Sequence, residues 1–130
     1  MANFYNPAGL PKPMGYSHAV EARGGRTVYV SGQIPLDAEG NLIGPDDMAA
    51  QAEQVFHNIA QALAAAGADF SHVVKLTFFL TDIGQIAAVR AVRDRYINTQ
   101  QPPASSAVEV RRLARDGLLV EVEAIAVIPD

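Results

Sequence analysis

The sequence contains no cysteine, and its content of charged residues is low. Without cysteine, a disulfide framework, a thiol nucleophile and a thiolate metal site are excluded. Only 18% of the 130 residues are charged, whereas 49% are hydrophobic. Because so short a chain has a large surface relative to its volume, this composition predicts that part of the surface contacts another subunit.

Clustered positive charge and long apolar runs are also missing. The formal net charge is −4, and the lysines and arginines are spread along the chain. Binding to phosphate backbones needs concentrated positive charge, so no nucleic-acid partner is expected. No segment approaches the run of about 18 apolar residues that a membrane helix needs, and residues 1–15 do not resemble a signal peptide. We therefore expect a cytoplasmic protein that has no membrane partner.

The three histidines are too far apart in sequence to predict a metal site. His57 has the position of a helix-surface residue, and His72 that of a residue at the beginning of a strand. His18 stands on a predicted strand and is the histidine best placed to face a cleft. The glycine spacing in residues 67–73 does not match a phosphate-binding loop. We expect neither a metal nor a cofactor.

The first third of the chain has the pattern of an arm followed by strands. Residues 6–15 contain three prolines and two glycines, which predicts an extended arm. Residues 16–22 and 26–32 predict two strands. Gly24 and Gly25 allow a tight reversal between them, so a hairpin is expected.

The next segment predicts an amphipathic helix that continues to about Ala66 and is ended by Gly67. Asp46 or Asp47 can cap its first turn. Gln51 and the other amide side chains of this helix lie off the apolar stripe. The stripe, which is expected to be buried, consists of Met48, Ala52, Val55, Phe56, Ile59 and Leu63.

The residues from 72 onward predict a strand, a helix and two more strands. Residues 72–80 predict a central strand. Asp82 caps a second helix, whose apolar stripe is formed by Ile86, Val89, Val92 and Tyr96 and whose arginines Arg90, Arg93 and Arg95 occupy the remaining surface. The prolines at 102 and 103 exclude a continuing helix, and residues 105–110 and 118–128 predict the last two strands.

The resulting order is ββαβαββ, a single α+β domain over residues 1–130 with two helices on one face of a mixed sheet. Two helices cover only one face, so association with other copies is expected to bury the other. Glu121 and Glu123 project to one face of the last strand. They are either solvated, or one of them lies in a partly apolar cleft where it can hold a water or move a proton.

Five stretches carry a resemblance to a known family: "YSHAV", "VYVSGQIPLD", "AAQAEQVFHNIAQALAAAGADFSHVVKLTFFLTD", "PPASSAVEV" and "LLVEVEAIAV". In their order and spacing they resemble the YjgF/RidA family of imine and enamine deaminases over residues 4–128. The resemblance implies a chorismate-mutase-like fold, a homotrimer with its sheets around a central barrel, and three small-molecule clefts between subunits. It implies that Tyr16, Ser31, Gly32 and Glu121 line the cleft, with Glu121 positioning the hydrolytic water.

The stretch "PPASSAVEV" departs from the family pattern. Active deaminases carry an arginine that binds the substrate carboxylate where this chain has Ser105, and a cysteine where it has Ala107. A short neutral hydroxyl cannot supply the forked, charge-assisted bond of a guanidinium. Arg90 either reaches the cleft from the second helix, or belongs to a solvated helix face that pairs with Asp94 or another subunit.

Two functions follow from the resemblance. In the first, the cleft hydrolyses an imine or enamine other than the usual 2-aminoacrylate-derived imino acid to a carbonyl compound and ammonia, with Glu121 as the catalytic residue. In the second, the trimer binds a more neutral small molecule through Tyr16, Ser105 and Ser106 without converting it.

Overall fold

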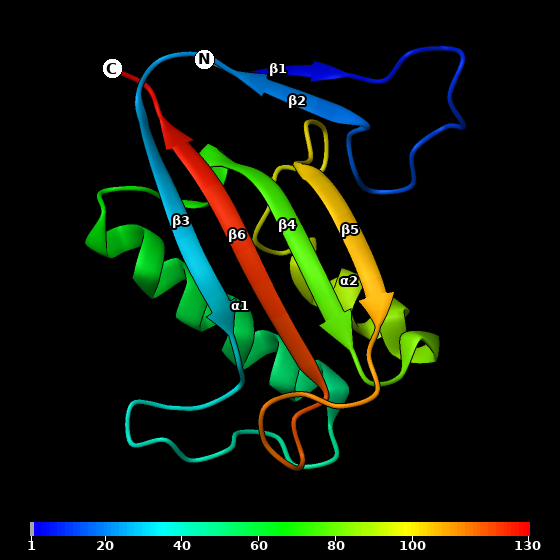
Figure 1. Ribbon diagram of the computed structural model, residues 1–130, viewed down its shortest axis with the longest axis vertical. Helices are drawn as coiled ribbons and strands as arrows, with labels where there is room; N and C mark the ends of the chain where they lie inside the picture. The colour runs from blue at the N-terminus through cyan, green and yellow to red at the C-terminus, as the bar shows by residue number, and fades with distance from the viewer. Residues whose placement is uncertain (1) are drawn as a thin grey trace.

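The computed structural model describes residues 2–130, and its main element is a four-stranded mixed sheet backed by two helices (Figure 1). In spatial order the strands are β3 (Arg26–Gln33), β6 (Val120–Ile128), β4 (Val73–Leu80) and β5 (Ala104–Glu109). Only the β4–β5 pair is parallel. Both helices, α1 (Met48–Ala65) and α2 (Ile86–Arg93), lie on the same face, which confirms the predicted α+β architecture.

The predicted hairpin between residues 16–22 and 26–32 is wrong. Strand β2 (Ala19–Ala22) instead pairs with β1 (Ala2–Tyr5), a strand that the sequence patterns did not predict, and β3 pairs with β6. The chain does reverse at Gly24 and Gly25, both at positive φ. A turn signal does not specify the strand's partner, however, and β3 gains a longer antiparallel ladder on the nine-residue β6.

Helix α1 follows the prediction closely, because its whole apolar stripe is buried. The carboxylate of Asp47 accepts a hydrogen bond from the backbone N–H of Ala50, so Asp47 is the capping residue. Gly67, at φ 77°, follows the end of the helix. Gln51, which lies off the apolar stripe, is nevertheless fully buried, and its side chain bonds to the backbone of Gly44, Gly117 and Leu119.

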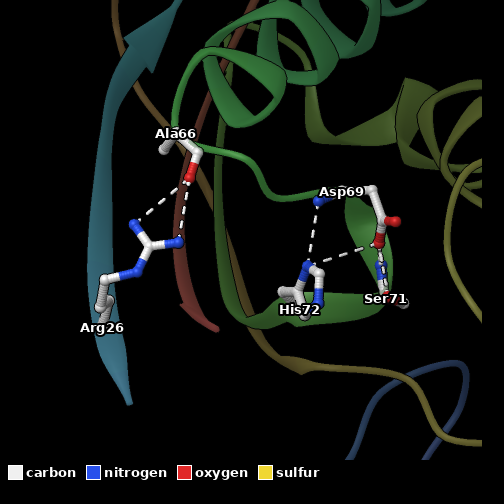
Figure 2. A network of polar contacts seen from close by, with 5 residues as sticks. All are labelled: Arg26, Ala66, Asp69, Ser71 and His72. Atoms are coloured by element: carbon white, nitrogen blue, oxygen red, sulfur yellow. Dashed lines mark hydrogen bonds and ion pairs between the residues drawn. The ribbon is translucent and has the colours of Figure 1, made fainter. Parts of the chain in front are cut away.

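A polar network closes the carboxyl end of α1 (Figure 2). Arg26 of β3 donates two hydrogen bonds to the carbonyl of Ala66. Asp69 caps the short 3-10 helix Phe70–His72, and the Ser71 hydroxyl and backbone N–H hold the pKa of that carboxyl below its usual value. His72 accepts from the backbone N–H of Asp69 through Nδ1, so this histidine serves as a cap immediately before β4.

Helix α2 ends at Arg93, earlier than its apolar stripe suggests. Asp82 caps the 3-10 turn Ile83–Gln85 that leads into the helix. Tyr96 lies beyond the helix but stacks on Phe56 of α1, with ring centroids 5.3 Å apart. Its hydroxyl donates to Glu53, and burial together with this carboxylate raises the pKa of Tyr96 to about 12.

The face of the sheet opposite the helices carries exposed apolar side chains. On β6, Glu121, Glu123 and Ile125 alternate with buried residues and so point to this face. Tyr29, opposite Ile125 in the ladder, is 77% exposed, and Val108 of β5 is 44% exposed. Burial of this face by other copies remains a prediction. Among the described residues, no helix is both long and apolar enough to span a bilayer.

Candidate functional site

A cavity of about 180 Å³ lies on the helix side of the edge strand β5. Four of the predicted site residues line it: Tyr16, Arg90, Ser105 and Ser106. The remaining lining residues are Met14, Phe78, Ile86, Arg93 and Ala107. The cavity is therefore built from the segment before β2, helix α2 and the two parallel strands.

The position of Tyr16 is fixed by its neighbour Ser17. Ser17 is 1% exposed, forms a parallel bridge with Ala104, and donates through its backbone N–H to the carbonyl of Pro103. Its hydroxyl donates to the carbonyl of Pro102. The proline corner that starts β5 is thus bonded to the segment that carries Tyr16, which brings residues far apart in sequence to one cavity.

The two serines differ in direction. Ser105 is paired with the buried Leu76 of β4, so its side chain points to the helix side, toward the cavity. Ser106 is exposed, and its hydroxyl lies 3.1 Å from Nζ of Lys75. Ser105 is consequently the serine with its hydroxyl beside the α2 side chains.

Arginine side chains form the α2 wall of the cavity. Arg90 is exposed, as a residue on a solvated helix face would be. Arg95 lies beyond the end of α2 and outside the cavity lining, and makes a 2.6 Å ion pair with Glu53. Arg93 does not fit that interpretation: it is 6% exposed, although it makes the predicted pair with Asp94. Sequence reasoning missed it, yet the three-residue spacing from Arg90 places both on one side of a helix.

The other predicted site residues lie elsewhere. Ser31 and Gly32 fall where the β3–β6 ladder is irregular, between Val30 and Gln33. Gly32 faces Glu121, since a Cβ on this glycine would stand 1.9 Å from Oε2 of Glu121. In one chain, therefore, Glu121 and the Tyr16 cavity lie on opposite faces of the sheet.

The histidines take part in local contacts. His18 has its Nε2 2.6 Å from the carbonyl oxygen of Pro11, and its ring packs edge-on against Tyr16. His57 is exposed on α1. Within residues 2–130, no group of three or more histidine, aspartate or glutamate side chains has a geometry that could hold a metal ion.

Comparison with known proteins places the chain in a family. A family model described as "Endoribonuclease L-PSP" matches residues 10–128. A solved structure from Yersinia pestis, the Rid-family protein YyfB, superimposes with a TM-score of 0.86 at 34% identity, covering 98% of each chain. The chain belongs to the YjgF/RidA family.

Two curated relatives are similar to the chain over most of their length. Protein DfrA of Myxococcus xanthus is 49% identical over 118 residues, which cover 90% of this chain and 88% of DfrA. A 2-iminobutanoate/2-iminopropanoate deaminase of Capra hircus is 41% identical over 112 residues, covering 86% of this chain and 79% of that enzyme. These similarities support a RidA-like function for the chain.

Proposed function

We propose that this protein forms a homotrimer whose inter-subunit clefts bind a small metabolite and hydrolyse an imine or enamine to a carbonyl compound and ammonia. The observation that carries the proposal is the cavity itself, in which Tyr16, Ser105 and two arginines converge at the edge of the sheet. A relative with 41% identity is named as an iminobutanoate and iminopropanoate deaminase, which supports this reaction class.

The cleft needs two copies of the chain because its proposed parts are on opposite faces. The Tyr16 cavity flanks the exposed edge strand β5, whereas Glu121 lies on the uncovered face with Gly32. A second copy that packs its uncovered face near β5 would bring its own Glu121 to the cavity. The exposed Tyr29 and Val108 supply apolar surface for such packing.

In the proposed reaction, one water adds to the C=N carbon while Glu121 accepts a proton from it. The nitrogen gains a proton, so the adduct is a carbinolamine. Its collapse forms the C=O bond, breaks the C–N bond and releases ammonia. An enamine first shifts a proton to carbon to become the imine. One water is consumed, no electron acceptor is needed, and holding the water beside the electrophile accounts for much of the acceleration.

Ser105 favours a second candidate function, the binding of a small molecule without turnover. By family resemblance this serine replaces the arginine of active deaminases, and a hydroxyl cannot form a charge-assisted forked bond with a carboxylate. On this alternative, Tyr16, Ser105 and Ser106 donate to or accept from a more neutral ligand. The same difference is the reason to propose a substrate other than the usual imino acid.

The test is ammonia release from a panel of imines generated in situ, among them 2-iminopropanoate, 2-iminobutanoate and their amides. We expect release above the buffer rate for at least one member of the panel. Glu121→Gln should lower this rate about a hundredfold or more, as loss of a positioned base does, whereas Glu123→Gln should not. Buffer rates across the panel, with ligand binding retained, would support the non-catalytic alternative instead.

A further inference from the structure

Arg93 is an unusual residue for the end of a helix, because its side chain is only 7% exposed. Its Nε and Nη2 both approach one oxygen of Asp94, at 2.9 and 2.8 Å. The Asp94 side chain is itself 45% exposed, so water weakens this pair. A buried guanidinium with one half-exposed counter-charge retains capacity for a second anion.

One part of the Arg93 guanidinium has no protein partner among the described residues. In the described part of the chain, Nη1 of Arg93 donates no hydrogen bond to a protein acceptor, and no fully buried side-chain nitrogen is without a partner. Nη1 therefore keeps some access to space. Arg93 lines the 180 Å³ cavity beside Ser105, and we infer that Nη1 has access to this cavity.

Gly15 holds the guanidinium in place. This glycine has φ 81°, and a Cβ built on it would lie 2.5 Å from Nη2 and 3.5 Å from Nη1 of Arg93. Only a residue without a side chain allows the backbone to approach so closely. The arm before Tyr16 thus closes over one side of the Arg93 head group and restricts its orientation.

The charge of the cavity wall differs from that of the whole protein. The chain has a formal net charge of −4, yet among the described residues that line the cavity there are two arginines and neither aspartate nor glutamate. Tyr16 and Ser105, whose side chain points to the helix side, add hydroxyl donors. A small, partly enclosed site with this composition favours an anionic group on its ligand.

We propose that Arg93, on helix α2, is the residue that binds an acid group on the ligand of this cleft. The acid group is held from helix α2 instead of from strand β5, with exposed Arg90 at the rim. The inference rests on the proposed function in taking the Tyr16 cavity as one wall of the ligand cleft. It makes Arg93 a specificity-determining residue for that cleft.

Binding of 2-oxobutanoate and of its neutral amide, measured by calorimetry on the intact protein, tests the assignment. The wild type should bind the acid more tightly than the amide. Arg93→Met should weaken acid binding about tenfold or more, the usual effect of losing a hydrogen bond to a charged group, and leave amide binding unchanged. Arg93→Lys should retain part of the preference. Arg95→Met removes an exposed arginine of the same segment and should have no effect.

A glycine pair tests the same point without removing the arginine. Gly15→Ala should displace the guanidinium and reduce the preference for the acid. Gly40→Ala is the matched control, because Gly40 has a similar φ of 83° and a Cβ added there would have nothing within 4 Å. Both variants carry similar backbone strain, so a loss of preference in Gly15→Ala alone identifies the displaced guanidinium. This pair remains informative if Arg93→Met does not fold.

The outcomes separate the acid anchor from the reaction. Equal binding of acid and amide by the wild type, or equal losses for both ligands in the Arg93 and Gly15 variants, would overturn the anchor and leave only a structural role for Arg93. Ammonia release without preference for acids would do so too, while the proposed hydrolysis stands. Acid-selective binding that depends on Arg93, without ammonia release from any imine, would support the anchor and contradict the hydrolysis.

Discussion

The carboxylate of Glu121 on β6 lies against the backbone of Gly32 on β3, at a distance that leaves no room for a side chain on that glycine. The irregular register between Val30 and Gln33 places this glycine opposite the glutamate. Local backbone geometry in one strand therefore determines where the carboxylate on the next strand can stand.

Gly32→Ala should consequently move the Glu121 carboxylate and lower ammonia release about tenfold or more, the range expected when a positioned base is displaced. The control is Gly9→Ala, since neither glycine has a positive φ and Gly9 has nothing within 4 Å. Steady-state kinetics check the rate, and thermal unfolding checks that both variants fold. Unchanged activity in Gly32→Ala would show that the position of Glu121 is unimportant.

We expect a large loss of stability when the buried amide of Gln51 is removed. Its Nε2 donates to the carbonyls of Gly44 and Gly117, and its Oε1 accepts from the N–H of Leu119. Gln51→Ala leaves the Gly117 carbonyl and the Leu119 N–H without partners, whereas the Gly44 carbonyl keeps the N–H of Asp47. The loss should lower the free energy of unfolding by about 2–4 kcal/mol. Urea unfolding measures this value, and Gln61→Ala on the exposed side of the same helix should change it little.

We expect the folded protein to lose stability at high pH as Tyr96 ionises. In the folded state its pKa is raised to about 12 from 10.0, because burial and Glu53 disfavour the phenolate. The neutral hydroxyl thus stabilises the fold fully below pH 10.0, and this contribution is lost as the pH rises to about 12. Urea unfolding between these values should show a smaller decline for Tyr96→Phe than for the wild type. Tyr29→Phe, at a 77% exposed position, should behave like the wild type.

Much of the fold follows from local patterns, whereas pairing partners do not. The helical period of the apolar residues in α1 identified its buried stripe. The alternation of apolar and polar residues in β6 placed Val120 and Val122 on one face of the strand and Glu121 on the other. The sequence also predicted the reversal at Gly24 and Gly25, but the two strands that flank it, β2 and β3, pair with β1 and β6 instead of with each other. A turn depends on a few residues, while strand pairing depends on segments far apart in sequence.

The candidate site was predictable where it depends on single residues and not where it depends on packing. Tyr16, Arg90 and Ser105 were selected from the sequence, and the structure brings them to one cavity. Arg93 was assigned to a solvated helix face because arginine is usually exposed. Its burial arises from the closure of Gly15 over the end of α2, a contact that no periodicity within the helix encodes.

The most direct test of the central claim, that each cleft takes one wall from each of two copies, is complementation between two inactive variants. Ser105→Phe fills the cavity beside Arg93, and Glu121→Gln removes the base from the other face. Each variant alone should release little ammonia. When the two variants are co-assembled in equal amounts, about a quarter of the clefts should combine the intact cavity of one variant with the Glu121 of the other. About a quarter of the wild-type activity should therefore return. If the mixed assembly, verified by mass spectrometry, stays as inactive as either parent, the cleft is not shared and the account is contradicted.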